Sequence, residues 1–324
     1  MNRSSMTSSP AGVTRRQMLR RSVSIAAAGA AILSGAGRLR GAEAEAPVVS
    51  KGRIKQSIVP WCWELFGEKW SLDRICQVAR SLGLTSVELT TAAGFPTLKK
   101  YGLTSAIVQI NMDPDPPFLK GFNNPDFWPK VMKATEEAID AAAAFGASNV
   151  ICFTGYSAKD PAKPDGARIS LEKGARNCVA GFKKIIGYAE QKKVTLCLEM
   201  LNSRDTSHPM KGHPGYQGDH TDYCIDIIKK VGSPRLKLLF DVYHVQIMDG
   251  DVIRRIQQFK EYIGHVHVAG CPGRGELDQT QELNFPPIMR ALIEAGYQGY
   301  VGQEFIPTRA PLQGLREAVA LCDV

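Results

Sequence analysis

The sequence predicts an α/β protein: a single (β/α)8 barrel of the TIM type, preceded by a twin-arginine signal peptide. Eight short apolar segments recur after residue 50, and segments with helical periodicity lie between them, as in a parallel barrel ringed by helices. An apolar run behind paired arginines near the first residue predicts the signal peptide. We therefore divide the chain into an export signal over residues 1–46, with an approximate cleavage point, and a barrel domain over residues 50–324.

The signal peptide has three expected parts. TRRQMLR at residues 14–20 supplies the arginines, a short apolar run covers residues 22–37, and small residues follow in AEAEA at residues 42–46. The run is too short and too rich in alanine and glycine for a membrane span, with an N-terminal anchor or an unstructured tail as the alternative. Cleavage after Ala44 would give an exported protein of the periplasm or cell envelope with no stable membrane span. Because the twin-arginine route carries folded proteins, a bound cofactor would be acquired before export.

The charge and the cysteines exclude other classes of protein. The formal net charge is +8, but the first 46 residues carry +5 of it through seven arginines against two glutamates, which leaves +3 for the rest. So small an excess offers no stripe of basic residues to follow a phosphate backbone, and no nucleic-acid partner is expected. The eight cysteines include no CxxC pair and fall in apolar segments. We expect buried free thiols rather than disulfides or a zinc knuckle.

The eight predicted strands are short, apolar and separated by longer segments. They cover residues 57–63, 85–89, 104–110, 148–153, 194–200, 236–242, 264–270 and 300–306. Strands that are buried on both faces of a parallel sheet have continuous apolar runs of this kind. Eight strand–helix units is the number that closes a barrel. The alternative, an open doubly wound sheet, would have a GxGxxG motif after its first strand, and the sequence lacks one there.

Four of the intervening segments carry an apolar face at helical spacing. They cover residues 72–82, 127–145, 175–189 and 252–263. A left-handed helix cap needs no side chain, and glycines stand near four predicted helix ends: Gly83, Gly146, Gly232 and Gly296. No stretch rich in proline, glycine or serine divides the barrel domain in two.

Polar side chains stand at the ends of the last four predicted strands: Glu199, Asp241, His267 and Glu304. The chemistry of such barrels lies at the C-terminal ends of the strands, so these side chains are expected to converge. Carboxylates a few ångströms apart repel each other unless a cation or a shared proton lies between them. Three carboxylates and one imidazole form a mostly oxygen site for one divalent metal ion. It suits Mn²⁺ or Mg²⁺, is compatible with Co²⁺, and disfavours a structural zinc site.

Each of these residues also has an ordinary explanation. A carboxylate at a strand end often caps a helix or forms a salt bridge, and a lone histidine is more often a core residue than a ligand. Four such residues at one level on consecutive strands weaken that explanation for the set. His265 points the same way one layer deeper, and we expect it behind the ligands or in the core. The role of Glu88 stays open between contact with a sugar hydroxyl and a loop cap.

At these residues the chain resembles the xylose-isomerase-like barrel superfamily, and within it the hydroxypyruvate isomerase and ketose 3-epimerase branch. The resemblance extends from QSIVPWCWELF to LREAVALC, nearly all of the barrel domain. Its most specific motifs are LLFDVYHVQ, IGHVHVAGCPGRGELDQTQELNFPPIMRAL and GYQGYVGQEFIPT.

The resemblance implies roles for six residues. Four of them would bind one divalent metal ion: Glu199, Asp241, His267 and Glu304. Glu199 and Glu304 would also be the catalytic acid and base, while His244 and Arg274 would contact the substrate. The activity implied is that of an isomerase or epimerase in carbohydrate metabolism, acting on a hydroxypyruvate-like acid or a keto-sugar through an enediolate. Such residue types fit this chemistry, because two carboxylates on opposite sides of a carbon next to a carbonyl can remove and return its proton.

Two departures count against hydroxypyruvate itself as the substrate. His267 stands where we expect a glutamine in hydroxypyruvate isomerases, which brings the site closer to the sugar epimerases. Hydroxypyruvate isomerases act in the cytoplasm, whereas this chain carries an export leader. We expect a small keto-sugar or hydroxy-keto acid as the partner, and a homo-oligomer stays open.

Three other functions compete with isomerisation. A dehydratase or lyase acting on a keto-sugar or keto-inositol would use the same metal and base. A non-catalytic exported sugar-binding protein would keep aromatic pocket residues but would not need the four ligands. The abasic-site endonucleases with three zinc ions share this barrel, but they need further ligands where this chain has Glu88, QIN at residues 109–111, and GRGELD.

Two more segments have open roles near the predicted site. The loop over residues 203–220 is either a lid over the substrate or solvent-facing, and it contains three histidines: His208, His213 and His220. The aromatic residues of SIVPWCWELF either form a wall of the substrate cavity or pack at the barrel mouth: Trp61, Trp63 and Phe66.

Overall fold

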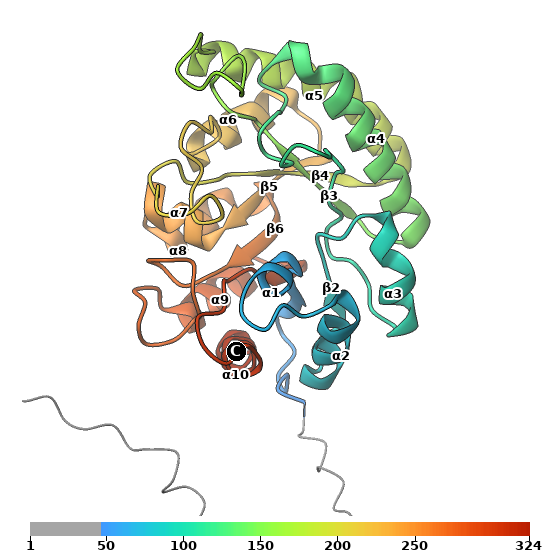
Figure 1. Ribbon diagram of the computed structural model, residues 1–324, viewed down its shortest axis with the longest axis vertical. Coiled ribbons are helices and arrows are strands. Elements are labelled where there is room, and N and C mark those ends of the chain that lie inside the picture. The colour runs from blue at the N-terminus through green and yellow to red at the C-terminus, as the bar shows by residue number, and fades with distance from the viewer. Residues whose placement is uncertain (1–46) are drawn as a thin grey trace, which may run out of the picture. The chain divides into compact units, whose positions relative to one another are not determined.

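The structure, a computed structural model, describes residues 47–324, so the predicted export signal and its cleavage point lie outside the described residues. Helices surround a central sheet (Figure 1). Seven strands form this sheet, all parallel, in the order β2-β1-β7-β6-β5-β4-β3. Their bounds are β1 Lys55–Ile58, β2 Ser86–Val87, β3 Asn149–Phe153, β4 Thr195–Glu199, β5 Leu236–Asp241, β6 Ile263–Val268 and β7 Tyr300–Gln303. The predicted parallel α/β architecture is therefore confirmed, with one strand fewer than expected.

The predicted strand over residues 104–110 is not a regular strand. It lies between β2 and β3 and joins them through single parallel bridges: Ser86 to Thr104, Thr90 to Val108, and Val108 to Val150. A side-chain hydroxyl replaces part of the backbone ladder, because the Ser86 hydroxyl accepts the Ala106 N–H. The Ser105 hydroxyl donates to the Ile107 carbonyl beside the Leu89 N–H. The eighth position of the barrel is thus filled by an irregular segment.

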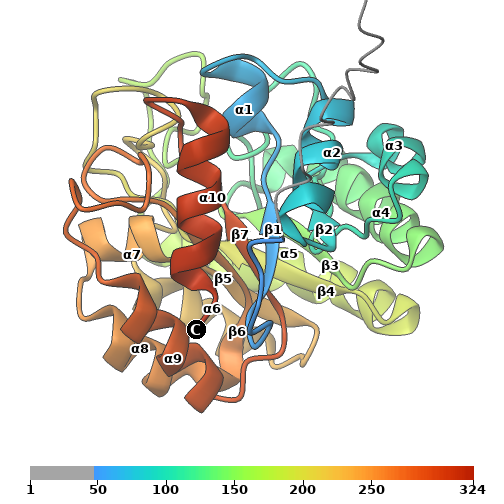
Figure 2. The same ribbon diagram turned by 90° about the horizontal axis from the view of Figure 1, so that it is seen from below.

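Ten α-helices lie in the described part of the chain. They are α1 Trp61–Leu65, α2 Leu72–Leu82, α3 Phe95–Lys100, α4 Trp128–Phe145, α5 Leu171–Lys192, α6 Thr221–Val231, α7 Val242–Met248, α8 Val252–Phe259, α9 Phe285–Glu294 and α10 Pro311–Cys322. Short 3₁₀ turns cover Ala92–Gly94, Pro125–Phe127 and Lys260–Tyr262. Figure 2 shows the helices on the outside of the strands, with α10 beside β7 and β1.

The predicted helices agree with α2, α4, α5 and α8, apart from their ends. Ser71 caps α2 by accepting the Arg74 N–H, and the four predicted cap glycines all have the left-handed φ expected of them. Residue Ile263 was included in the last predicted helix but begins β6 instead. Among residues 47–324, no helix is both long and apolar enough to cross a bilayer.

The eight cysteines are all buried and unpaired, as predicted. Cys152 and Cys197 lie inside β3 and β4, and Cys178 and Cys224 lie on the inner faces of α5 and α6. Thiols in such places serve as small apolar groups.

The strand register brings four strand ends to nearly one level. Asp241 pairs with His267 between β5 and β6, and Val268 pairs with Gln303, the residue before Glu304. Glu199 pairs with Leu239, two positions before Asp241. The four predicted ligands therefore start within about two residues of the same height, as the sequence predicted.

Candidate active site

Four side chains from four consecutive strands meet at the C-terminal end of the barrel. Glu199 and Asp241 are the last residues of β4 and β5, His267 is the next-to-last residue of β6, and Glu304 follows β7. One ligand atom from each lies within 4.8 Å of the others, and the four residues are at most 5% exposed. We call these four residues the carboxylate–histidine cluster.

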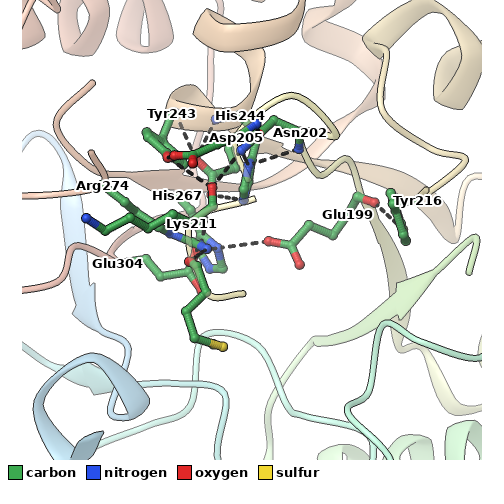
Figure 3. A network of polar contacts seen from close by, with 12 residues as sticks. Glu199, Asn202, Asp205, Lys211, Tyr216, Tyr243, His244, His267, Arg274 and Glu304 are labelled. Carbon is green, nitrogen blue, oxygen red and sulfur yellow. Dashed lines mark hydrogen bonds and ion pairs between the residues drawn. The ribbon is translucent and has the colours of Figure 1, made fainter. Parts of the chain in front are cut away.

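The closest approach within the cluster involves His267. Its Nδ1 lies 2.8 Å from Glu304 Oε2 and 3.5 Å from Glu199 Oε1 (Figure 3). The two oxygens of Asp241 have different neighbours: Oδ1 accepts the Tyr243 and His244 N–H groups and caps α7, while Oδ2 lies 3.5 Å from His244 Nε2 and 3.5 Å from a terminal nitrogen of Arg274. Asp241 therefore caps α7 with one oxygen, and the other oxygen stays available for the predicted ligand role.

Three atoms of the cluster have no well-aligned hydrogen bond within the described residues: Glu199 Oε1, His267 Nδ1 and Glu304 Oε2. Leaving buried polar atoms unsatisfied costs about 1–3 kcal/mol each, so such a group normally has a ligand or a function. Two carboxylate oxygens and an imidazole nitrogen directed at one point match the donors that a hard divalent cation prefers. The residues therefore fit a metal ion.

The carboxyl groups of the cluster differ in their electrostatics. Burial raises the pKa of Glu199, and the nearby charge of Glu304 raises it further, while a hydrogen bond from His267 partly opposes both. Burial likewise raises the pKa of Asp241, to about 7. For Glu304 burial is outweighed by the positive charges of Arg274 and His267, which hold its pKa well below the usual value. Environments that separate the pKa values of two carboxyls are typical of an acid and base pair.

Glu88 lies behind the cluster and binds both buried histidines. Its Oε1 lies 2.8 Å from His267 Nε2 and 2.9 Å from His265 Nε2, and all three side chains are fully buried. Burial opposes the charge of Glu88, but the two imidazoles outweigh it and lower its pKa to about 2. Gly302 leaves room for this contact, because a Cβ at that position would lie 2.2 Å from Glu88 Oε1. Glu88 thus faces neither a sugar hydroxyl nor a loop, and His265 lies behind the ligands as predicted.

This contact sets the orientation of His267. When Nε2 carries the proton that Glu88 accepts, the Nδ1 lone pair faces the three carboxylates, as metal-bound histidines are commonly held. Burial alone would lower the pKa of His267, but the surrounding carboxylates, Glu304 foremost, raise it well above the usual value. The position next to Nδ1 therefore favours a positive charge, whether a proton or a metal ion supplies it.

His244 is oriented by a neighbour that sequence reasoning missed. Its Nδ1 accepts from the backbone N–H of Asn202 at 3.0 Å and lies 2.7 Å from the Asn202 side-chain nitrogen. Because Nδ1 accepts, the proton is on Nε2, which lies 3.5 Å from Asp241 Oδ2 and has no hydrogen-bond partner in the described part of the chain. Burial, with the charge of Arg274, holds the pKa of His244 well below the usual value, so the ring is neutral.

Arg274 joins the cluster to the loop over residues 203–220. One terminal nitrogen lies 2.6 Å from Glu304 Oε2 and 3.5 Å from Asp241 Oδ2, while the other donates to the Met210 carbonyl at 2.8 Å. Burial opposes its charge, but Glu304 and Asp241 outweigh that effect and raise its pKa further. The guanidinium also lies over the Trp61 ring, 5.1 Å from the ring centroid.

A cavity of about 470 Å³ opens beside the cluster. Glu199, Glu304 and Arg274 line it, but the other predicted substrate contact, His244, does not reach its surface. The loop over residues 203–220 covers part of it, through Pro209, Met210 and His213. The structure therefore favours the lid interpretation of this loop.

The remaining histidines and aromatic residues, whose roles the sequence left open, lie in different places. His220 lies outside the cavity, with Nδ1 2.6 Å from Asp249 Oδ1, and His208 packs its ring against Phe66. Trp61 lines the cavity and donates from Nε1 to Glu304 Oε1 at 3.0 Å, whereas Trp63 is a core residue packed against Phe305. Both tryptophans lie in α1 and not in the predicted strand over residues 57–63, because β1 ends at Ile58; one of them contributes to the site and the other to the core.

The fold and the cluster define a class of protein, a parallel α/β barrel with a buried carboxylate–histidine site at the C-terminal ends of its strands. The chain belongs to the xylose isomerase-like TIM barrel family, whose model matches residues 76–323. This family is the one that the sequence motifs resemble.

Individual relatives and structures are similar to this chain over different lengths. Hydroxypyruvate isomerase from Escherichia coli (strain K12) is 29% identical over 179 residues, 55% of this chain and 63% of that protein. A 2-oxo-tetronate isomerase from Cupriavidus necator is 38% identical over 122 residues, 38% of this chain and 44% of that protein. The chain thus spans less than two thirds of the length of the relatives it matches.

Two examples illustrate the likeness to solved structures. The AP endonuclease, family 2, from Brucella melitensis superposes with a TM-score of 0.69 at 23% identity, covering 81% of this chain and 97% of that one. A 3-keto-D-glucoside 4-epimerase from E. coli superposes with a TM-score of 0.64 at 18% identity, covering 83% and 98%. At these identities the likeness concerns the fold alone.

Proposed function

We propose that the protein is an isomerase or epimerase that transfers a proton next to the carbonyl of a small α-hydroxy carbonyl compound, through an enediolate. The observation that carries this proposal is the pair Glu199 and Glu304, which come from β4 and β7, line one cavity and have pKa values shifted in opposite directions. The names of the relatives support the same reaction class, since a hydroxypyruvate isomerase and a 2-oxo-tetronate isomerase are among them.

In this proposal the cluster, Glu199, Asp241, His267 and Glu304, holds one divalent ion, Mn²⁺ or Mg²⁺ first and Co²⁺ next. When bound, such an ion polarises the carbonyl and hydroxyl oxygens of the substrate and acidifies the C–H between them. Titrating Mn²⁺ into the purified protein by calorimetry tests the site directly. Asp241→Asn is expected to weaken binding at least tenfold, and equal affinity in this variant would count against the assignment.

The chain's own residues supply the proton transfer. Glu199 takes the proton from the carbon next to the carbonyl, since its raised pKa makes it a stronger base than an ordinary carboxylate. For isomerisation, Glu199 returns the same proton at the neighbouring carbon. For epimerisation, Glu304, ionised because of its low pKa and held in place by Trp61 and Arg274, takes the proton of the substrate hydroxyl and delivers it to the opposite face of the carbon. The proton on Glu199 then goes back to the oxygen. Arg274 places positive charge where the enediolate becomes negative, and the buried cluster keeps water from competing. Atoms balance, because the product is an isomer of the substrate.

Proton NMR in D₂O tests the function. The Mg²⁺-loaded protein would be mixed with hydroxypyruvate, ketohexoses and keto-inositols, with Glu199→Gln as the matched blank. Deuterium next to the carbonyl, or an isomeric product, that is lost in the variant would support the proposal. A product that has lost water or a fragment would favour a dehydratase or lyase. If the compounds bind equally to both proteins without any reaction, a sugar-binding role replaces catalysis.

We also propose that residues 1–46 direct export by the twin-arginine route to the periplasm or cell envelope. The paired arginines, Arg15 and Arg16, support this proposal. Fractionation of cells that express the protein or its Arg15→Lys, Arg16→Lys variant tests it. The variant is expected to stay inside the cell, and unchanged fractionation of the two proteins would contradict the proposal.

A further inference from the structure

The cavity continues beyond the carboxylates along a mostly apolar wall. Its volume of about 470 Å³ lies within the range of roughly 300–1,000 Å³ that proteins use for drug-sized ligands, and a three-carbon acid fills only a small part of such a space. Apolar side chains make up most of the lining away from the cluster, and they include Phe118, Leu119, Ile151, Phe153 and Leu201. A substrate that fills this cavity has an extended part with an apolar face.

Phe118 lies at the centre of this wall. Its ring stacks on Tyr156 with centroids 6.3 Å apart and planes at 22°, and it meets Phe153 edge-on at 6.3 Å. The His213 ring lies closer, 4.4 Å from the Phe118 centroid. Phe118 is partly exposed, and it lines the cavity. The wall therefore presents aromatic surface to whatever the cavity holds.

Backbone contacts hold the wall in place. Residues 118–123 run beside the chain that leaves β3, through hydrogen bonds from Phe122 N to Phe153 O (3.2 Å) and from Asn123 N to Thr154 O (2.8 Å). Gly121 makes this approach possible, because a Cβ there would lie 2.4 Å from the Thr154 carbonyl carbon. A wall tied to the sheet in this way keeps its shape without a ligand, which lowers the entropy cost of binding.

Two polar side chains, Gln109 and His213, line the same cavity as the wall. Gln109 lines the cavity, and its buried side-chain oxygen has no hydrogen-bond partner among the described residues. His213 is only 2% exposed, and burial lowers its pKa to about 3, so it is a neutral donor or acceptor 3.5 Å from the Tyr156 hydroxyl. A sugar ring has the matching character, since its C–H faces are apolar and its edge carries hydroxyls.

We infer that this wall is a subsite for a sugar ring, stacked on Phe118 with its hydroxyls toward Gln109 and His213. The substrate is then an α-hydroxy ketone within a pyranoside ring, rather than a three-carbon acid. The inference rests on the proposed function of the carboxylate–histidine cluster and adds the part of the substrate that does not react. Gln109, Phe118 and His213 act as specificity-determining residues.

The test compares a ring substrate with small ones on the metal-loaded protein. The ring probe is methyl 3-keto-β-D-glucopyranoside, and the small probes are hydroxypyruvate and dihydroxyacetone, each followed by exchange and product formation in D₂O. We expect kcat/KM for the ring probe to exceed that for either small probe at least tenfold. Phe118→Ala is expected to lower kcat/KM at least tenfold for the ring probe and less than threefold for dihydroxyacetone.

Two further variants separate the subsite from general damage. Phe118→Tyr keeps the aromatic face and should restore at least half of the wild-type kcat/KM for the ring probe. Phe127→Ala removes a partly buried phenylalanine that does not line the cavity, and it should leave both reactions unchanged. Hydroxypyruvate as the preferred substrate, or equal losses for both kinds of probe in Phe118→Ala, would overturn the inference.

A binding measurement keeps the two proposals apart. If no probe reacts, the proposed isomerase activity fails, and calorimetry of the ring probe then decides the subsite alone. Binding to the wild-type protein that weakens at least tenfold in Phe118→Ala supports the subsite. Absence of binding, or equal binding to both proteins, overturns it.

Discussion

The two parts of the barrel that line the cavity are built differently. From β4 to β7 the strands pair through backbone ladders, with one register shift between β5 and β6 at Leu238 and Leu239, and each strand brings one side chain of the carboxylate–histidine cluster to nearly the same level. From β2 to β3 the barrel is closed by single bridges, and the chain after residue 110 supplies the apolar wall instead. Strands joined by backbone ladders fix the height of the reacting atoms, whereas an irregular segment can turn inward and shape the space beside them.

The largest effect on activity should come from the strands β4 to β7, which bear the carboxylate–histidine cluster. Glu304→Gln removes one carboxylate of the cluster. We expect kcat to fall by about 10²–10⁴-fold, the usual contribution of a positioned acid or base. On the other side, Gln109→Ala should raise KM and leave kcat within about threefold, because the residue contacts the part of the substrate that does not react. Steady-state kinetics with the best substrate measures both. A fall in kcat for Gln109→Ala would erase the distinction between the two parts.

Glu88→Gln probes the support behind the cluster. The variant weakens the acceptor that orients His267, and loss of such a partner usually costs about 10–100-fold in metal affinity. Calorimetric titration with Mn²⁺ measures it. The control is Glu276→Gln, which alters a buried carboxylate that accepts hydrogen bonds from Thr308 and Arg309 and should leave metal affinity unchanged. Equal affinity in Glu88→Gln would show that His267 needs no such support.

Gly121→Ala tests the attachment of the wall. The added methyl group would meet the Thr154 backbone at 2.4 Å, so we expect a loss of about 1–3 kcal/mol in the free energy of unfolding and a higher KM, with metal affinity unchanged. Gly187→Ala in α5 is the matched control. Its new methyl group meets nothing within 4 Å, and alanine in a helix should be neutral or stabilising. Urea denaturation compares them, and equal stabilities would mean that the wall is loosely held.

The smallest effect concerns pH and His213. Burial lowers the pKa of this imidazole from 6.5 to about 3, so the unfolded chain binds its proton first and the stabilising contribution of His213 is lost as pH falls below about 6.5. Between pH 6.5 and 5 the wild type should therefore lose roughly 1–2 kcal/mol more stability than His213→Gln. His220→Gln alters an exposed histidine of the same loop and should follow the wild type. If the free energy of unfolding has the same pH dependence in all three proteins, His213 is not buried in its neutral form.

The cluster was predictable from the sequence because its residues obey the periodicity of their strands. Glu199, Asp241, His267 and Glu304 each end an apolar run, and parallel strands bring their ends to one edge. Strand prediction uses only the composition of a short segment, which also explains why the predicted strand over residues 104–110 is wrong. Residues 104–110 have the right composition, but they pair with their neighbours only through single bridges, and the Ser86 hydroxyl accepts the Ala106 N–H that a regular ladder would pair.

The rest of the site depends on contacts between distant parts of the chain. Glu88 meets two histidines about 180 residues away, and a single carboxylate after a two-residue strand gives no sign of such partners. Phe118 lies in a stretch without periodicity, so its place in the cavity could not be predicted. Asn202 offered a weak local signal, because a polar side chain three residues after Glu199 remains near the strand end.

The eight buried cysteines can be used to measure local opening of the structure. All eight are buried and at most 3% exposed. Burial also raises the thiol pKa of the two cysteines in the strands, to about 12 for Cys197. A soluble alkylating reagent therefore reaches each one only when the surrounding structure opens. Because the thiols are spread over α1, α2, α5, α6, α10, β3 and β4, with another after β6, the labelling rate of each cysteine would map local opening around the barrel without any introduced probe.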